Sequence, residues 1–84
     1  MTIFAGNLAG NVTEDDLREL FRAHGEVAFV NVIKGRDHRT SAGYGFVSMP
    51  VEKEGEAAIA SLHLRVVKGQ AINVNEARSR TLQA

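Results

Sequence analysis

Hydrophobic and polar positions follow two different periods along the chain. Short runs of β-prone residues, apolar or alternating with polar ones, predict strands over residues 2–6, 26–34, 42–49 and 70–77. Apolar residues at helical spacing predict helices over residues 12–25 and 51–64. The six segments therefore follow one another in the order β-α-β-β-α-β.

The two predicted helices differ in the strength of their signals. Thr13 is a favourable N-cap for the first helix, Asp16 stands at its third position, and Gly25 offers a stop. Its apolar stripe consists of Leu17, Leu20 and Phe21. The second helix is weaker because it contains Gly55. Its apolar face consists of Ala58, Ile59 and Leu62.

This order of elements predicts an α+β fold of the ferredoxin-like type. In that arrangement a four-stranded antiparallel sheet carries both helices on one face, and the other face stays open to solvent. A chain of 84 residues has room for one domain, so we expect residues 1–84 to form a single domain.

The third predicted strand decides which face is open. Tyr44 and Phe46 share one of its faces, and the other face carries Gly43, Gly45, Val47 and Met49. If the latter set is buried, Phe4 and several asparagines lie on the open face beside the rings. The opposite choice buries those asparagines, at roughly 1–3 kcal/mol for each one left without a partner. We therefore expect the rings to face solvent. Phe29, at the entrance of the second strand, could face either way.

Two segments on the predicted central strands carry a family resemblance. The sequences IFAGNL (Ile3 to Leu8) and AGYGFVSM (Ala42 to Met49) resemble the two ribonucleoprotein signatures of the RNA-recognition motif. The longer signature matches over residues 43–47 and departs at Ala42, where a basic residue is usual, and at Met49, where an aromatic one is usual. The spacing of all six elements fits this family, and the chain looks most like its small single-domain bacterial members.

The resemblance implies a non-enzymatic protein that binds single-stranded RNA, with Phe4, Tyr44 and Phe46 stacking on bases. The ten basic and ten acidic residues cancel, which argues against binding by charge alone. However, seven acids lie on the predicted helices, whereas basic residues lie in the loop between the second and third strands and near the C-terminal end. The predicted RNA-binding residues are Phe4, Asn31, Lys34, Arg36, Arg39, Tyr44, Phe46, Asn73, Asn75 and Arg78.

Other functions have weaker support from the sequence. The same exposed rings would also suit a protein–protein interaction module, which is the main alternative. An enzyme on this architecture would need a phosphate-binding loop or a placed catalytic group, and neither is recognisable. The chain has no cysteine, and its three histidines are far apart, so we expect no metal, cofactor or catalytic residue. We expect a cytoplasmic monomer without membrane or small-molecule ligands, which could also bind single-stranded DNA in vitro.

Overall fold

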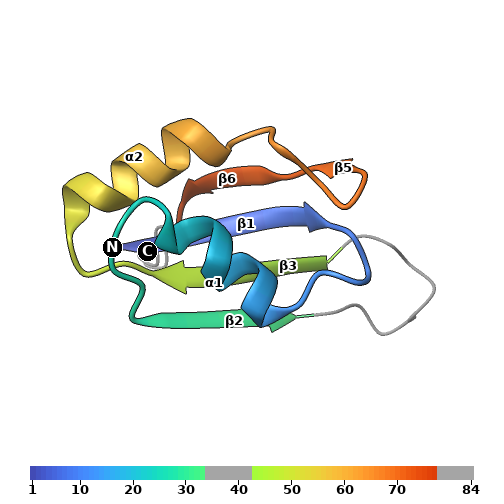
Figure 1. The fold of residues 1–84 in the computed structure, drawn as a ribbon, viewed down its shortest axis with the longest axis horizontal. Coiled ribbons are helices and arrows are strands. Elements are labelled where there is room, and N and C mark those ends of the chain that lie inside the picture. Colours follow the sequence, from blue (N-terminus) through green and yellow to red (C-terminus); the bar gives the residue numbers. More distant parts are fainter. Residues whose placement is uncertain (34–42, 78–84) are drawn as a thin grey trace, which may run out of the picture.

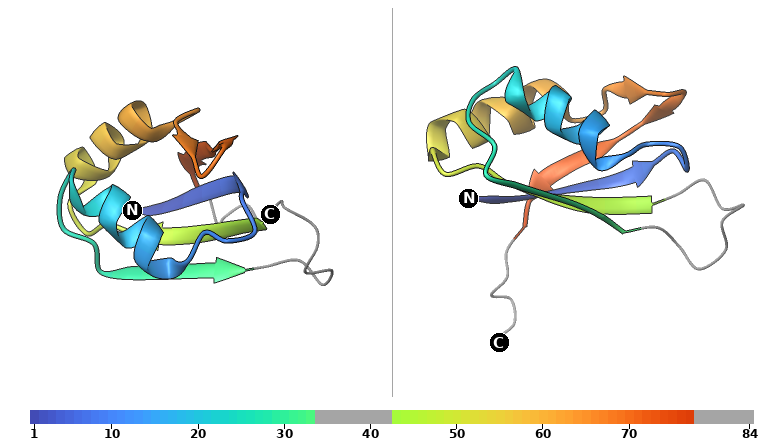
Figure 2. Two further views of the ribbon diagram at one scale, coloured as in Figure 1. Left: turned by 45° about the vertical axis from the view of Figure 1, so that its right-hand side comes forward. Right: turned by 60° about the horizontal axis from the view of Figure 1, so that its bottom comes forward.

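The computed structural model describes residues 1–33 and 43–77. Its elements are β1 (Thr2–Leu8), α1 (Glu14–Arg22), β2 (Phe29–Ile33), β3 (Gly43–Ser48), α2 (Glu52–Leu62), β4 (Val66–Val67), β5 (Gln70–Ala71) and β6 (Asn73–Glu76) (Figure 1). Four strands form an antiparallel sheet in the order β2-β3-β1-β6. Both helices pack on one face of this sheet and leave the other face uncovered (Figure 2). This is the predicted ferredoxin-like fold.

The core lies between the sheet and the two helices. Its buried side chains are Ile3, Ala5, Leu8, Ala9, Val12, Leu17, Phe21, Val30, Val47, Met49, Ala58, Leu62, Ile72 and Val74. Apart from Leu8, the strand residues in this set are those expected from alternation, which confirms the predicted faces of all four sheet strands. Leu8 follows the register shift in β1, which breaks the two-residue period there. Two residues are less buried than predicted. Val32 packs on the core but is only partly buried, and Gly43 is half-buried because it lies at the first position of β3.

The start of α1 follows the predicted capping pattern. The hydroxyl of Thr13 accepts a hydrogen bond from the backbone N–H of Asp16 at 3.2 Å. In return the Asp16 carboxylate accepts one from the Thr13 N–H at 2.8 Å. The two bonds form a capping box that satisfies donors left free at a helix N-terminus. After α1, Gly25 adopts a φ of 153°, which favours glycine.

The segment after α2 differs from the prediction. Helix α2 ends at Leu62, and Leu64 then takes a φ of 67°. The last predicted strand is split into β5 and β6, and β5 pairs with a strand that the sequence did not indicate, β4. Lys68 and Gly69 join this hairpin with φ values of 51° and 90°, as a two-residue type I′ turn requires. No helix in the described part of the chain is long and apolar enough to cross a membrane.

Candidate nucleic-acid interface

Strand pairing arranges the open face in three rows that cross the sheet in the order β2, β3, β1, β6. We name each row by one of its rings. The Phe46 row is Asn31, Phe46, Phe4 and Asn75. The Tyr44 row is Ile33, Tyr44, Gly6 and Asn73. The Phe29 row is Phe29, Ser48 and Thr2. Each row is an uninterrupted line of neighbours across the pleat, about 6.7 Å from the next row at two residues per step.

Phe4, Tyr44 and Phe46 form a cluster on the two central strands, which we call the ring triad. The Phe4 ring centroid lies 6.0 Å from that of Tyr44 and 5.8 Å from that of Phe46. The Tyr44 and Phe46 centroids are 6.0 Å apart, with the ring planes nearly perpendicular at 88°. These are favourable distances and angles for aromatic pairs, so each ring holds the others in place. The triad is confirmed on the open face, with Tyr44 41% exposed and the other two rings half-buried.

Glycines shape the ring triad from both sides. The Phe4 ring lies over Gly6, where an added Cβ would come within 2.7 Å of the ring atom Cε2. On the helical side, a Cβ at Gly45 would lie 2.5 Å from the backbone oxygen of Asn31 and 3.3 Å from Leu17 Cδ1. Gly45 therefore lets β2 and α1 approach β3 closely. The two glycines let the ring triad form directly on a tightly packed sheet.

Amide side chains flank the triad on the two edge strands. Asn31 lies beside Phe46, and Asn75 lies beside Phe4. Asn73 follows in the Tyr44 row. Among the described residues, none of these three side-chain amides forms a hydrogen bond. The hydrogen bonds of side-chain amides there are made by Asn7 and Gln70. Each amide can therefore donate and accept hydrogen bonds at the edge of a base. No charged residue lies in the three rows.

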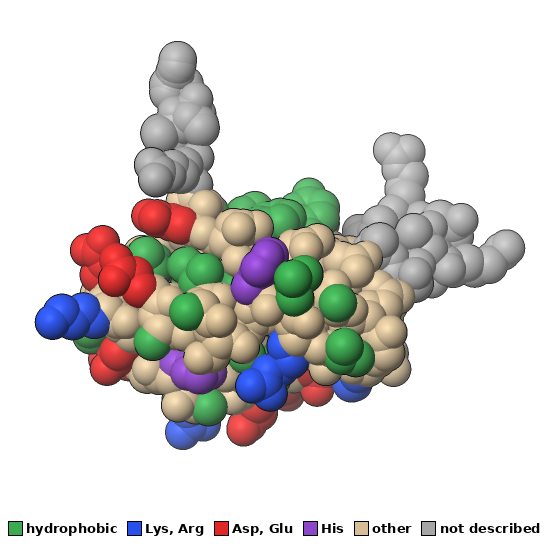
Figure 3. Space-filling view, turned by 90° about the horizontal axis from the view of Figure 1, so that it is seen from above, with side chains coloured by type: hydrophobic (Ala, Val, Ile, Leu, Met, Phe, Trp, Pro, Cys, Tyr) green, Lys and Arg blue, Asp and Glu red, His purple; other side chains and the backbone are tan. Residues whose placement is uncertain are grey.

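The predicted charge pattern places acidic residues on the helices and basic residues beside the sheet. The predicted basic contacts Lys34, Arg36, Arg39 and Arg78 lie outside the described residues. The acids are on the helices as predicted. Glu14, Asp15, Asp16 and Glu19 belong to α1, and Glu52, Glu54 and Glu56 belong to α2. In Figure 3 acidic side chains gather on the left, at the end where α2 begins, and hydrophobic side chains line the upper edge, where the open face is seen edge-on.

Two polar residues that could have contacted a ligand have structural roles instead. Asn7 adopts a φ of 58° at the irregularity in β1, and its side-chain N–H donates to the Ala71 carbonyl at 2.9 Å. Its backbone oxygen accepts a hydrogen bond from Gln70. His63 Nδ1 accepts a hydrogen bond from the backbone N–H of Val74 on the outer edge of β6 at 3.0 Å. Both side chains therefore tie the segment after α2 to the sheet.

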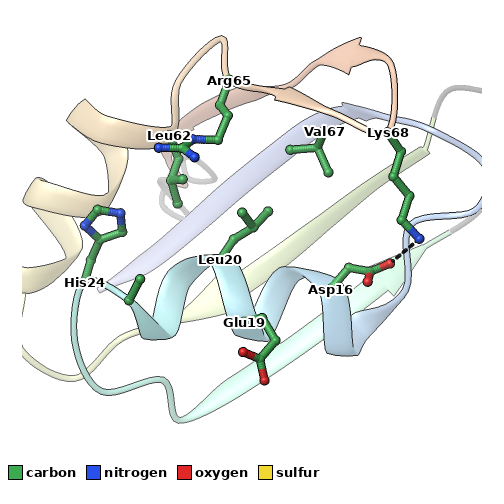
Figure 4. A pocket seen from close by; sticks show the side chains of 9 residues that line it. Asp16, Glu19, Leu20, His24, Leu62, Arg65, Val67 and Lys68 are labelled. Atoms are coloured by element: carbon green, nitrogen blue, oxygen red, sulfur yellow. Dashed lines mark ion pairs between the residues drawn. The ribbon is translucent and has the colours of Figure 1, made fainter.

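A hollow of about 330 Å³ lies on the helical side, between α1 and the β4–β5 hairpin (Figure 4). Leu20 points from α1 toward Val67 of the hairpin, and Lys68 closes one end through a 3.0 Å ion pair with Asp16. The pKa of Asp16 is lowered, first by the hydrogen bond from the Thr13 backbone and then by Lys68. The residues around this hollow do not form a nucleophile and base arrangement, and the described residues contain no metal-binding cluster of three or more His, Asp or Glu side chains. The ring triad is therefore the best candidate site.

Comparison with known sequences shows the family to which the chain belongs. The sequence model described as "RNA recognition motif" matches residues 3–73. The chain belongs to the RNA recognition motif family. Within it, this RNA recognition motif is 38% identical to RbpE of Nostoc sp. over 95% of the chain and 81% of the relative. It is also 38% identical to "Glycine-rich RNA-binding protein 1" of Mycosarcoma maydis, over 93% of the chain and 45% of the relative.

Solved structures share the fold of this RNA recognition motif. The crystal structure of "RNA Binding Protein PG1" superimposes with a TM-score of 0.82 at 38% identity, over 92% of this chain and 93% of that one. The two RNA recognition domains of Sex-lethal from Drosophila melanogaster give a TM-score of 0.80 at 27% identity, over 92% of this chain and 49% of that one. The chain spans less than half the length of the first curated relatives it matches.

The sequence left one row of the open face unassigned. Phe29 is 55% exposed and shares the face of Asn31, because its neighbour Val30 is turned into the core. Ser48 pairs with both Phe29 and Thr2, so the three side chains lie side by side. The signal was present in the alternation of β2, since a buried Val30 places Phe29 on the open face.

Proposed function

We propose that this RNA recognition motif binds single-stranded RNA by stacking bases on Phe4, Tyr44 and Phe46. The observation that carries the proposal is the ring triad itself, a group of mutually packed rings on an uncharged, uncovered sheet face. Stacking of a base on an aromatic side chain contributes about 1–3 kcal/mol and tolerates every base, because each has a π-face. The unpartnered amides of Asn31, Asn73 and Asn75 would add contacts to base edges.

Single strands fit this surface better than duplexes do. In an RNA duplex the bases are stacked on one another and their faces are hidden, whereas unpaired bases can turn onto a ring. The two central strands carry the rings and the edge strands carry the amides, so one strand of RNA can cross the sheet with its bases facing the rings. Single-stranded DNA has the same bases and would bind in vitro through the same rings.

The backbone of the RNA would contact basic residues beside the sheet. We assign this role to Lys34, Arg36, Arg39 and Arg78, as the sequence suggests. Because the chain has no net charge, these contacts are few and stacking dominates the binding energy. We also expect the protein to be a cytoplasmic monomer without catalytic activity, and these points stay predictions.

The proposal is tested by fluorescence anisotropy with a labelled uridine-rich octamer and the Phe46→Ala variant. The substitution should weaken RNA binding by about 1–3 kcal/mol, the value of one stacked base. It also removes two aromatic contacts of about 0.5–1.5 kcal/mol each, so the thermal midpoint should fall, and affinity is compared at a temperature where the variant is folded. Val66→Ala is the matched control, because Val66 is 67% exposed but belongs to the β4–β5 hairpin on the other side of the molecule. Equal affinity of Phe46→Ala, Val66→Ala and the wild type would contradict the proposal. If the wild type does not bind RNA but self-associates through the rings, the protein-interaction alternative is favoured.

A further inference from the structure

His63 is the residue that follows α2, and its ring contacts the outer edge of the sheet. Strand β6 is the last strand in the sheet order, and β1 pairs with its inner edge. At the outer edge, where the chain returns from α2 (Figure 1), His63 Nδ1 accepts a hydrogen bond from the Val74 N–H at 3.0 Å. Because Val74 has no exposed surface, water cannot replace His63 as the acceptor while the fold is closed.

This hydrogen bond requires one particular form of the His63 ring. Nδ1 accepts only when it carries no proton, so the ring must be neutral with its proton on Nε2. A second proton makes Nδ1 a donor, and two donors then face each other at the position of the bond. Histidine as a residue type changes its charge between about pH 5 and 8. His63 is exposed, so protons from solvent reach its ring directly.

The charges around His63 leave its ring without an ion pair in the described part of the chain. The nearest charged residues along the surrounding elements are Glu56 on α2, Arg65 in the connection after it, Lys68 on the β4–β5 hairpin and Glu76 on β6. Lys68 is engaged in an ion pair with α1. Arg65 extends into the hollow beside α1 (Figure 4). Among these described residues, a protonated ring therefore finds no carboxylate already in contact with it.

The backbone beside His63 is strained. Leu64 has a φ of 67°, a left-handed conformation that is unfavourable for a residue with a Cβ atom. Its side chain is 59% exposed, so little packing compensates for the strain. The Leu64 N–H donates to the Ile72 carbonyl at 2.7 Å, and the Ile72 N–H donates to the Arg65 carbonyl at 3.0 Å. These two bonds and the bond between His63 and Val74 hold the connection after α2 in place, so loss of one favours release of the strain.

We propose that His63 is a pH-sensitive latch, which fastens the connection between α2 and β4 to the outer edge of β6 when its ring is neutral and releases it when the ring is protonated. Release frees the N–H of Val74, which lies between Asn73 and Asn75, while the inner edge of β6 stays paired with β1. The latch is a property of the protein without RNA. It therefore stands or falls independently of the proposed function.

The test is hydrogen exchange of the Val74 amide in the RNA-free protein, followed by NMR at about pH 7.5 and about pH 5. The rates are expressed as protection factors, which correct for the intrinsic pH dependence of exchange. In the wild type this protection should fall at least about five-fold on acidification, the value of one lost hydrogen bond. His63→Asn should keep high protection at both pH values, because Asn Oδ1 lies as many bonds from Cβ as Nδ1 does and does not titrate. His63→Leu fills similar space without an acceptor, so its protection should be low at both.

His24→Asn is the matched control. His24 is also partly exposed and its ring makes no hydrogen bond to another described residue, so this variant should keep the pH dependence of the wild type. Amides in β1 and β3 should keep their protection at both pH values, because only the edge opens. Ring ¹⁵N shifts at the higher pH should place the His63 proton on Nε2.

Several results would overturn the latch. One is a Val74 protection factor that is the same at both pH values in the wild type, and another is a pH dependence that persists in His63→Asn. A His63 proton on Nδ1 at the higher pH would also exclude it. An equal loss of protection in β1 and β3 would show global unfolding in place of local release. If His63→Leu does not fold, the comparison of the wild type with His63→Asn still decides.

Discussion

Gly6→Ala should displace the Phe4 ring without moving the backbone of β1. An alanine Cβ at position 6 would lie 2.7 Å from Phe4 Cε2 and 2.8 Å from Phe4 Cζ, where ordinary contact begins at 3.4 Å. The ring must therefore retreat by at least about 0.7 Å, away from its present 6.0 Å and 5.8 Å spacings to Tyr44 and Phe46. Because the obstructing atoms are at the far end of a rotatable side chain, the strand itself can stay in place.

The energies predict a change in binding with little change in stability. Gly6→Ala weakens two aromatic contacts of about 0.5–1.5 kcal/mol each, which lowers the free energy of unfolding. Replacing a strand glycine with alanine raises it by about 0.5–1 kcal/mol, so the two effects offset each other. The free energy of unfolding, measured by urea denaturation, should thus stay within about 1 kcal/mol of wild type. A base that stacks on the displaced Phe4 ring makes a poorer contact and loses part of the roughly 1–3 kcal/mol of stacking energy. Losing about 1 kcal/mol of it lowers RNA affinity about five-fold.

A double-mutant cycle makes this prediction specific to the Phe4 ring. In a Phe4→Ala background there is no ring to displace, so Gly6→Ala should leave RNA affinity unchanged. Both variants and the double variant are compared by anisotropy with one octamer at one salt concentration. Undiminished binding by Gly6→Ala, or an equal loss in both backgrounds, would refute the reasoning that the Phe4 ring lies over Gly6 as a stacking surface.

Four further predictions concern the scaffold and the charges. Gly45→Ala should lower the free energy of unfolding by about 1–3 kcal/mol, because its Cβ would meet the Asn31 backbone oxygen at 2.5 Å, and an unchanged urea midpoint would contradict this. Thr13→Ala removes the capping box and should cost about 1 kcal/mol in the same assay. The pKa of Asp16 is lowered from 3.8 by the hydrogen bond from the Thr13 backbone and by Lys68. The Asp16 carboxylate therefore stabilises the folded protein fully above pH 3.8, and this contribution is lost as the pH falls through the lowered pKa. The difference in free energy of unfolding between the wild type and Asp16→Asn should therefore shrink on acidification. A difference that does not change with pH would contradict this role of Asp16. RNA affinity should fall with salt with a log–log slope of about −1.5 to −3, and a much steeper slope would mean that charge dominates over stacking.

Much of the site followed from the alternation of residues in the strands. Placing Val47 and Met49 in the core required Tyr44 and Phe46 to face the other way, and the same parity placed Phe4 beside them. The first helix was equally readable because Thr13 and Asp16 form a local motif that needs no tertiary information. These predictions succeeded because each depended on neighbours in sequence or on the strict two-residue period of a strand.

The segment after α2 could not be predicted in the same way. Strands β4 and β5 have two residues each, which is too short for a period to be seen. They form because Lys68 and Gly69 adopt positive φ values and because Asn7 and Gln70 bridge the hairpin to β1, and both depend on tertiary structure. Phe29 was left open for another reason. The parity of Val30 decides its side only if both residues belong to the paired strand, and the sequence does not show where pairing begins. In the structure Phe29 is the first residue of β2 and pairs with Ser48.

The most direct test of the central claim is an NMR titration of the isotope-labelled protein with a single-stranded RNA octamer. If RNA binds to the open sheet face, the backbone amides of β1 and β3 and the ring signals of Phe4, Tyr44 and Phe46 should shift most. Smaller changes should follow on the exposed sides of β2 and β6, and the amides of α1 and α2 should hardly move. Saturable shifts confined to α1 and the β4–β5 hairpin, with the three ring signals unchanged, would contradict the claim that the open sheet face binds RNA.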